Sequence, residues 1–120
     1  MVNINGISIP IEVASTPVAR ARGLSGRASL TEGSGMFFVF EEEDEWGIWM
    51  KEMNFALDIV WADSTGKIIT IKKNISPETY PQTFYPATPS KYVLEVPAGF
   101  TELHAIAEGD EIIIHANPAL

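Results

Sequence analysis

The chain has 120 residues, of which 46% are hydrophobic, and its 8 basic and 16 acidic side chains give a formal net charge of −8. This length fits a single domain, residues 1–120, with a buried core. The negative charge argues against binding to nucleic acid or to an anionic membrane. The chain has no cysteine, which excludes disulfides, thiol nucleophiles and thiolate zinc sites.

The beginning of the chain predicts a β-hairpin. Isoleucine and valine alternate with other residues over 7–13, and Asn5-Gly6 before them is a tight-turn signal. We therefore expect residues 2–4 and 7–13 to pair, with Pro10 at a sheet edge. Residues 1–13 lack the basic start and apolar run of a signal peptide, and no segment reaches the roughly 20 apolar residues of a membrane span. We expect a soluble protein.

A short helix is predicted next, over residues 17–22. Thr16 supplies a capping hydroxyl, Pro17 suits the first helical position, and Gly23 is a typical helix end. The three arginines of the chain lie on and just after this segment, at Arg20, Arg22 and Arg27. A helix turns about 200° over two residues, so Arg20 and Arg22 are expected on different sides of it.

The middle and end of the chain are rich in strand patterns. The acidic run 41–45 is interpreted as a solvated hairpin tip between two of these strands. The predicted strands are 36–40, 46–50, 57–61, 67–73, 91–96 and 111–115.

Two further segments complete the prediction. Residues 76–90 carry four prolines between aromatic residues and are expected to form a long loop without a regular ladder. Residues 101–107 are expected to form a helix of one to two turns. About eight short strands with two small helices predict a mostly β protein, a compact antiparallel barrel or sandwich.

Several stretches in this order resemble the domain of unknown function 192 family of bacteria and archaea. They run from about residue 8 to residue 115. They include Arg20-Ala21-Arg22-Gly23-Leu24, Arg27, Gly35-Met36-Phe37-Phe38-Val39-Phe40, Trp49-Met50-Lys51, Leu57-Asp58-Ile59, Asp63, Gly66, Tyr92-Val93-Leu94-Glu95, Ala98-Gly99 and Gly109-Asp110.

The resemblance implies a mostly β fold of jelly-roll-like character and no assigned activity. Many members of the family look like exported proteins, which leaves the location of this chain unassigned. The chain departs from the usual family pattern at Ser25, Glu52 and Ala105, where methionine, asparagine and glycine are common. Glu52 in particular places a charge beside Lys51.

The arginines and one aromatic residue are the candidates for ligand binding. Guanidinium groups form bidentate contacts with carboxylates and phosphates, and they can equally satisfy acceptors inside the fold. In a strand, Trp49 and Lys51 share a face, so they could hold a sugar or a planar polar ligand, or instead pack in the core and pair with an acid.

Asp58 and Glu95 form a candidate pair of carboxylates. Each lies opposite the apolar face of its strand, and they could act as the acid and base of a glycosidase or pair with basic residues. His104 and His115 have no metal-ligand spacing, and the acidic run lacks the alternation and glycine of a calcium loop. No metal or other cofactor is predicted.

Three functions stay open at this point. The leading hypothesis is a non-catalytic binding or accessory domain for a small polar or anionic ligand or a partner segment. The alternatives are a hydrolase acting on a glycan or cell-envelope polymer, and an interaction module that presents Tyr80, Phe84 and Tyr85 to another protein. The oligomeric state is not predicted. The residues expected to line the binding site are Arg20, Arg22, Arg27, Trp49, Lys51, Asp58 and Glu95.

Overall fold

The structure is a computed structural model that describes residues 1–115. Its strands form a five-stranded sheet of order β3-β4-β9-β6-β7, a three-stranded sheet of order β10-β1-β2, and the short pair β5-β8. The elements are β1 (Val2–Ile4), β2 (Ile7–Ile9), β3 (Ile11–Ala14), α1 (Pro17–Arg22), β4 (Gly35–Asp44), β5 (Ile48–Trp49), β6 (Leu57–Ala62), β7 (Ile68–Ile75), the 3-10 helix η1 (Pro77–Thr79), β8 (Thr83–Phe84), β9 (Ser90–Pro97), α2 (Phe100–Leu103) and β10 (Ile113–Ile114).

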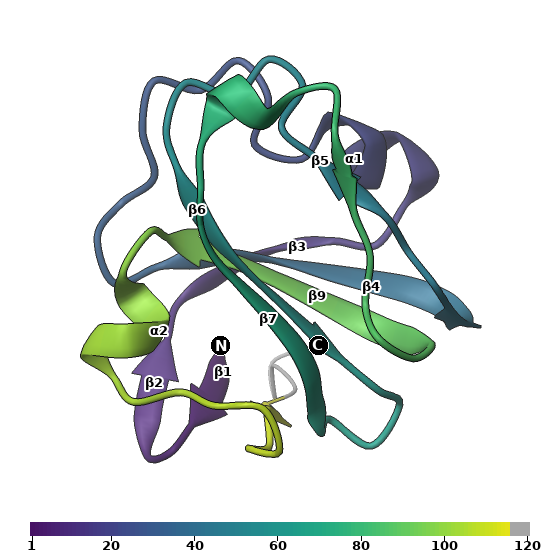
Figure 1. Cartoon of the computed structure of the whole chain (residues 1–120). Coiled ribbons are helices and arrows are strands. Elements are labelled where there is room, and N and C mark those ends of the chain that lie inside the picture. The colour runs from purple at the N-terminus through teal and green to yellow at the C-terminus, as the bar shows by residue number, and fades with distance from the viewer. Residues whose placement is uncertain (116–120) are drawn as a thin grey trace.

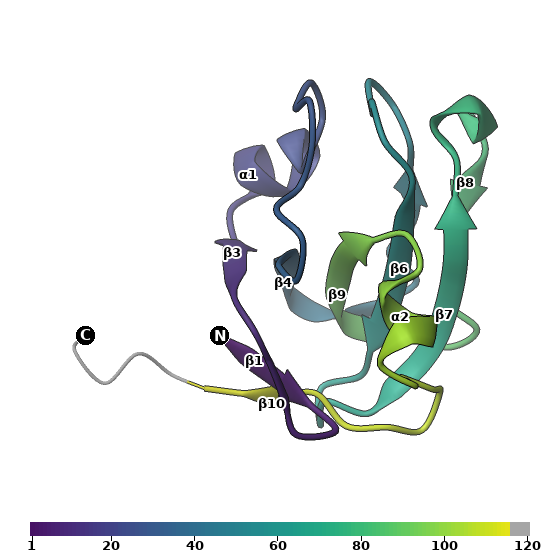
Figure 2. The same cartoon turned by 90° about the vertical axis from the view of Figure 1, so that its left-hand side faces the viewer.

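The five-stranded sheet is the middle layer of the molecule. Figure 1 shows α1 and β5 above it and the hairpin β1-β2 with α2 below it, and Figure 2 shows the same layers from the side. The prediction of a mostly β protein with two short helices is confirmed. The sheets do not close on themselves, so the sandwich is the predicted architecture that fits.

Each face of the middle sheet carries its own hydrophobic core, because side chains alternate between faces along a strand. The first core faces β1, β2 and α2, and the second core faces α1 and β5. The first core includes Ile4, Ile9, Phe37, Val60, Leu94, Val96 and Phe100. The second core includes Leu24, Met36, Phe38, Met50, Ile59, Trp61 and Val93.

The amino-terminal strand differs from the prediction. Residues 2–4 pair with residues 7–9 as an antiparallel hairpin, as expected, but Pro10 divides the predicted strand 7–13 in two. The second part, β3, leaves the hairpin and runs parallel to β4 at one edge of the middle sheet. The sheet is therefore mixed, where an antiparallel one was predicted.

Three other expectations are corrected, two of them by the pairing of strands. β4 continues through the acidic run as far as Asp44, which pairs with Ser90, so this run is an exposed strand extension and no hairpin tip. Thr83 and Phe84 in the proline-rich loop form β8, which pairs with β5. α2 covers Phe100–Leu103, shorter than the predicted 101–107.

β4 and β9 approach each other very closely at Gly35, the first residue of β4. A Cβ atom at this position would lie 2.6 Å from the carbonyl oxygen of Glu95. Real Cβ contacts are not this short, so glycine is required for the register that pairs Met36 with Glu95. This pairing fixes Glu95 near the centre of the sheet, on the face of the second core.

Candidate functional site

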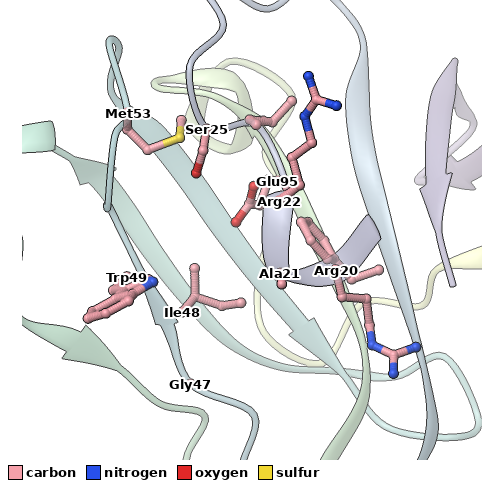
Figure 3. A pocket seen from close by; sticks show the side chains of 12 residues that line it. Arg20, Ala21, Arg22, Ser25, Gly47, Ile48, Trp49, Met53 and Glu95 are labelled. Carbon is pink, nitrogen blue, oxygen red and sulfur yellow. The ribbon is translucent and has the colours of Figure 1, made fainter. Parts of the chain in front are cut away.

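A hollow of about 180 Å³ lies between α1 and the middle sheet, and we call it the α1 pocket. Residues 20–25 form one wall, and residues 47–49 with Met53 form the other. Phe38 of β4 and Glu95 of β9 close it on the side of the sheet. Figure 3 shows these side chains around the hollow.

α1 forms where the sequence predicts it, because its signals are local. The Thr16 hydroxyl accepts a hydrogen bond from the Ala19 N–H at 3.1 Å and caps the helix, with Pro17 at its first position. Gly23 ends it at φ +49°, a backbone conformation that favours glycine. A Cβ at Gly23 would also lie 3.3 Å from the Phe38 ring, so glycine lets the end of the helix lie against the pocket wall.

Arg20 is held by the fold. Its Nη1 atom donates to the carbonyl oxygens of Ser15 at 2.8 Å and Val39 at 3.0 Å, and its guanidinium lies 5.0 Å from the centre of the Phe40 ring. Figure 3 shows the guanidinium turned away from Glu95. Arg20 lines the α1 pocket with the rest of its side chain and ties α1 to β4.

Arg22 lies two residues further on, at the rim of the pocket. Its side chain is exposed and contributes to the lining, and Figure 3 shows its guanidinium extending away from Glu95. Within residues 1–115 the structure shows one ion pair, which joins Arg27 to Glu12, so Arg22 has no carboxylate partner among them. Arg22 therefore carries a positive charge at the pocket that the described part of the fold does not neutralise.

Glu95 is the polar group of the pocket floor. Its side chain is only 5% exposed, and among the described residues no hydrogen bond or ion pair to its carboxyl group is found. Its cross-strand neighbours, Met36 and Ile59, are apolar. Burial raises the pKa of Glu95 from 4.5 to about 8. The carboxyl is therefore mostly protonated at pH 7, and in this form it can both donate and accept a hydrogen bond.

Asp58 lies on the opposite face of the sheet from Glu95. It pairs with Val96 of the first core, whereas Glu95 pairs with Ile59 of the second. Its oxygens accept hydrogen bonds from the backbone N–H groups of Asn74, Gly99 and Thr101 at 2.8–3.3 Å and from the Thr101 hydroxyl at 2.7 Å. Asp58 anchors the start of α2, and the two carboxylates share no groove.

Arg27 and Lys51 also lie outside the lining of the α1 pocket. Arg27 forms a bidentate ion pair with Glu12 on β3, and this hydrogen bonding lowers the pKa of Glu12. Lys51 is exposed, and its Nζ atom lies 5.6 Å from the centre of the Trp49 ring.

Trp49 stands at the rim of the pocket and is 46% exposed. Its ring is 5.2 Å from that of Tyr80, which is 43% exposed. Of the expected site residues, Arg20, Arg22, Trp49 and Glu95 thus line one hollow, and Arg27, Lys51 and Asp58 do not.

Several lining residues carried no sequence signal of their own. Phe38, Ile48 and Met53 look like ordinary core residues, and Ser25 looks like a turn residue. The Ser25 hydroxyl donates to the Lys51 carbonyl at 2.9 Å and so joins the segment after α1 to the opposite wall. Within residues 1–115 no three histidine, aspartate or glutamate side chains lie close enough to hold a metal ion, and no helix could span a membrane.

The comparisons with known proteins agree with the sequence resemblance. Residues 1–114 match the profile of the DUF192 family, described as an uncharacterized ACR. The chain belongs to this family. No curated protein is similar to this DUF192 member.

Two solved structures share its fold. One is a Sinorhizobium meliloti 1021 protein named "putative transcription regulator", with 29% identity over 92% of this chain and 89% of its own and a TM-score of 0.83. The other is a Novosphingobium aromaticivorans DSM 12444 protein of unknown function, with 27% identity over 94% and 83% and a TM-score of 0.87. These comparisons thus show the family and the fold of this chain, and they assign no chemistry to the site.

Proposed function

We propose that this DUF192 chain is a single, non-catalytic binding domain that holds a small polar or anionic ligand in the α1 pocket. The observation that supports this most strongly is the carboxyl group of Glu95. Polar groups inside a protein normally have a hydrogen-bond partner. Within residues 1–115 none is found for the Glu95 carboxyl group, although it is not fully enclosed: the fully enclosed side-chain polar atom without a partner in this range is Ser90 Oγ. Glu95 faces the hollow, where a ligand can supply a partner.

The arrangement gives no support to the hydrolase alternative. Glycosidases need two carboxyl groups across one groove, whereas Asp58 and Glu95 lie on opposite faces of the sheet. The four hydrogen bonds to Asp58 also commit it to the fold. A binding role does not need a second carboxyl group beside Glu95.

A regulatory role, as in the name of the S. meliloti relative, is compatible with this proposal only in an indirect form. A formal net charge of −8 opposes direct contact with DNA phosphates. The chain would act by sensing a ligand or by contacting a partner protein.

The test is nuclear magnetic resonance titration with a panel of small carboxylates, amines, sugars and inorganic phosphate. We expect at least one compound to shift the backbone amides that surround the α1 pocket. Ala21→Trp should abolish that shift, because Ala21 lines the hollow from the exposed side of α1. Val18→Trp is the matched control on the same helix, at a residue that is 80% exposed and outside the lining.

Circular dichroism should show that both variants keep the fold. The proposal fails if no compound shifts the pocket amides, or if binding is unchanged in Ala21→Trp.

A second candidate function rests on the exposed aromatic residues beside the rim. Trp49, Tyr80 and Tyr85 are 46%, 43% and 56% exposed, whereas Phe84 packs against the second core. Such a surface suits a partner segment better than a small ligand. Titration shifts that centre on these residues and persist in Ala21→Trp would favour this candidate.

A further inference from the structure

Building on the proposed function, we propose that the ligand of the α1 pocket is a small monocarboxylate with an apolar body. Its carboxylate accepts a hydrogen bond from the Glu95 carboxyl. The exposed Arg22 side chain, which extends away from Glu95 in Figure 3, turns toward the hollow to pair with the bound carboxylate. Its apolar part lies against Phe38, Ile48 and Met53. The charges, the size and the lining of the pocket each support this class.

The local charge of the pocket is opposite to that of the whole chain. Its ionised lining residues at pH 7 are Arg20 and Arg22, because Glu95, the acidic lining residue, has a pKa of about 8. Arg20 already donates to two carbonyl oxygens, so Arg22 is the cation left for a ligand. A monoanion matches this single charge.

Two other ligand classes fit less well. An amine would have to bind near a guanidinium and would need Glu95 to ionise inside the protein. A phosphate dianion would bring two charges to a pocket with one available cation. Both classes are therefore outcomes of the test below.

The volume and walls of the pocket define the rest of the ligand. A cavity of roughly 150 Å³ with apolar walls holds one benzene molecule, and the α1 pocket has about 180 Å³. Phe38, Ile48 and Met53 are apolar, and Trp49 adds an aromatic edge at the rim. One ring or one short branched chain fills this space, with the carboxylate directed to Glu95.

The Glu95 carboxyl and a carboxylate ligand would share one proton in a charge-assisted O–H···O⁻ bond. The ligand is anionic throughout the neutral range, so Glu95 must supply that proton. With a pKa of about 8 for Glu95, the Glu95 carboxyl is protonated in about one-tenth of the ligand-free molecules at about pH 9. The apparent affinity should be about tenfold lower there than at about pH 6.

Isothermal titration calorimetry with benzoate, benzylamine, benzyl alcohol and inorganic phosphate tests the ligand class. We expect benzoate to bind best, with a dissociation constant of about 1 mM or lower at about pH 6. Its affinity should fall about tenfold by about pH 9. Titration in buffers of different ionisation enthalpy should show that binding takes up a proton at the higher pH.

Three variants separate the roles of the residues. Glu95→Gln keeps a hydrogen-bond donor, so it should bind benzoate with an affinity that no longer depends on pH, whereas Glu95→Ala should lose binding. Arg22→Gln should weaken benzoate binding at least tenfold. Arg27→Gln is its control, because Arg27 pairs with Glu12 outside the pocket.

The results distinguish this inference from the proposed function. If benzylamine, benzyl alcohol or phosphate binds in the α1 pocket with an affinity equal to that of benzoate, the inferred ligand class is wrong and the proposed binding function stands. The monocarboxylate is also wrong if benzoate binds equally at both pH values, or if Arg22→Gln has no effect. If no compound of either panel binds in the pocket, both proposals are overturned.

Discussion

At the scale of single residues, the two buried carboxylates of the middle sheet are stabilised in different ways. Asp58 accepts four hydrogen bonds around the start of α2, which satisfy its carboxyl oxygens inside the protein. Glu95 has apolar neighbours and no such donors among the described residues, so burial favours its protonated form. A chain that only needed a core would be expected to have an apolar residue at position 95.

The protonation of Glu95 makes a prediction about stability and pH. An unfolded chain loses this proton near pH 4.5, and the folded protein holds it up to about pH 8. The contribution of Glu95 to stability is therefore greatest below about pH 4.5, falls as pH rises, and levels off above about pH 8. The fall is at most about 1.4 kcal/mol per pH unit.

Glu95→Gln removes this titration while keeping a similar shape. Urea denaturation of both proteins between about pH 4 and pH 9 should show the variant gaining stability relative to wild type as pH rises. Glu41→Gln, at an exposed position of β4, should run parallel to wild type. Parallel curves for Glu95→Gln would show that Glu95 ionises normally in the folded protein.

At the scale of elements, a helix determined by local signals could be predicted from the sequence, whereas the pairing of distant strands could not. Helix 17–22 was placed correctly because Thr16, Pro17 and Gly23 act on their own neighbours. The acidic run was misplaced because its structure depends on Ser90, far away in the chain. The parallel course of β3 likewise depends on β4, which residues 11–14 cannot indicate alone.

The Thr16 cap allows a test of how α1 supports the pocket. Thr16→Ala removes the acceptor of the Ala19 N–H, so we expect a loss of about 1 kcal/mol in the free energy of unfolding. Amide hydrogen exchange should be faster in α1 than in the wild type, because the helix frays from its first turn. Denaturation and exchange measured on the same samples check both effects.

Ser15→Ala is the control for this change. Ser15 is exposed and accepts the Arg20 hydrogen bond through its backbone carbonyl, which the substitution retains. Its stability should stay close to that of the wild type. Equal losses of unfolding free energy in Thr16→Ala and Ser15→Ala would mean that the hydroxyl of Thr16 does not stabilise the helix.

At the scale of the whole molecule, the sequence could nominate site residues but could not place them together. Asp58 and Glu95 both lie on strands with apolar residues on both faces. Only the register of β6 with β9 shows that the two side chains are on opposite faces of the sheet. The three arginines are close in sequence, yet the guanidinium of Arg20 binds backbone carbonyls, that of Arg22 has no carboxylate partner within residues 1–115, and that of Arg27 pairs with Glu12 of β3. The turn of α1 separates Arg20 from Arg22, and the path of the chain after α1 takes Arg27 to β3.

The middle sheet also connects the two cores, and this predicts that they unfold together. β4, β6 and β9 contribute residues to both cores, so neither core can lose its packing while the sheet stays intact. We expect one cooperative transition in urea, with the same midpoint by circular dichroism and by tryptophan fluorescence. Trp61 is fully buried in the second core and contributes to the fluorescence.

Removing one methylene from either core should lower the unfolding midpoint by the same amount whether it is followed by circular dichroism or by fluorescence. Ile9→Val lies in the first core and Ile59→Val in the second, and both residues are fully buried. Each should lower the free energy of unfolding by about 1 kcal/mol and shift both midpoints equally. If Ile9→Val moved the circular dichroism midpoint and left the fluorescence midpoint in place, the cores would be independent. The α1 pocket would then sit on a separately folding half of the molecule.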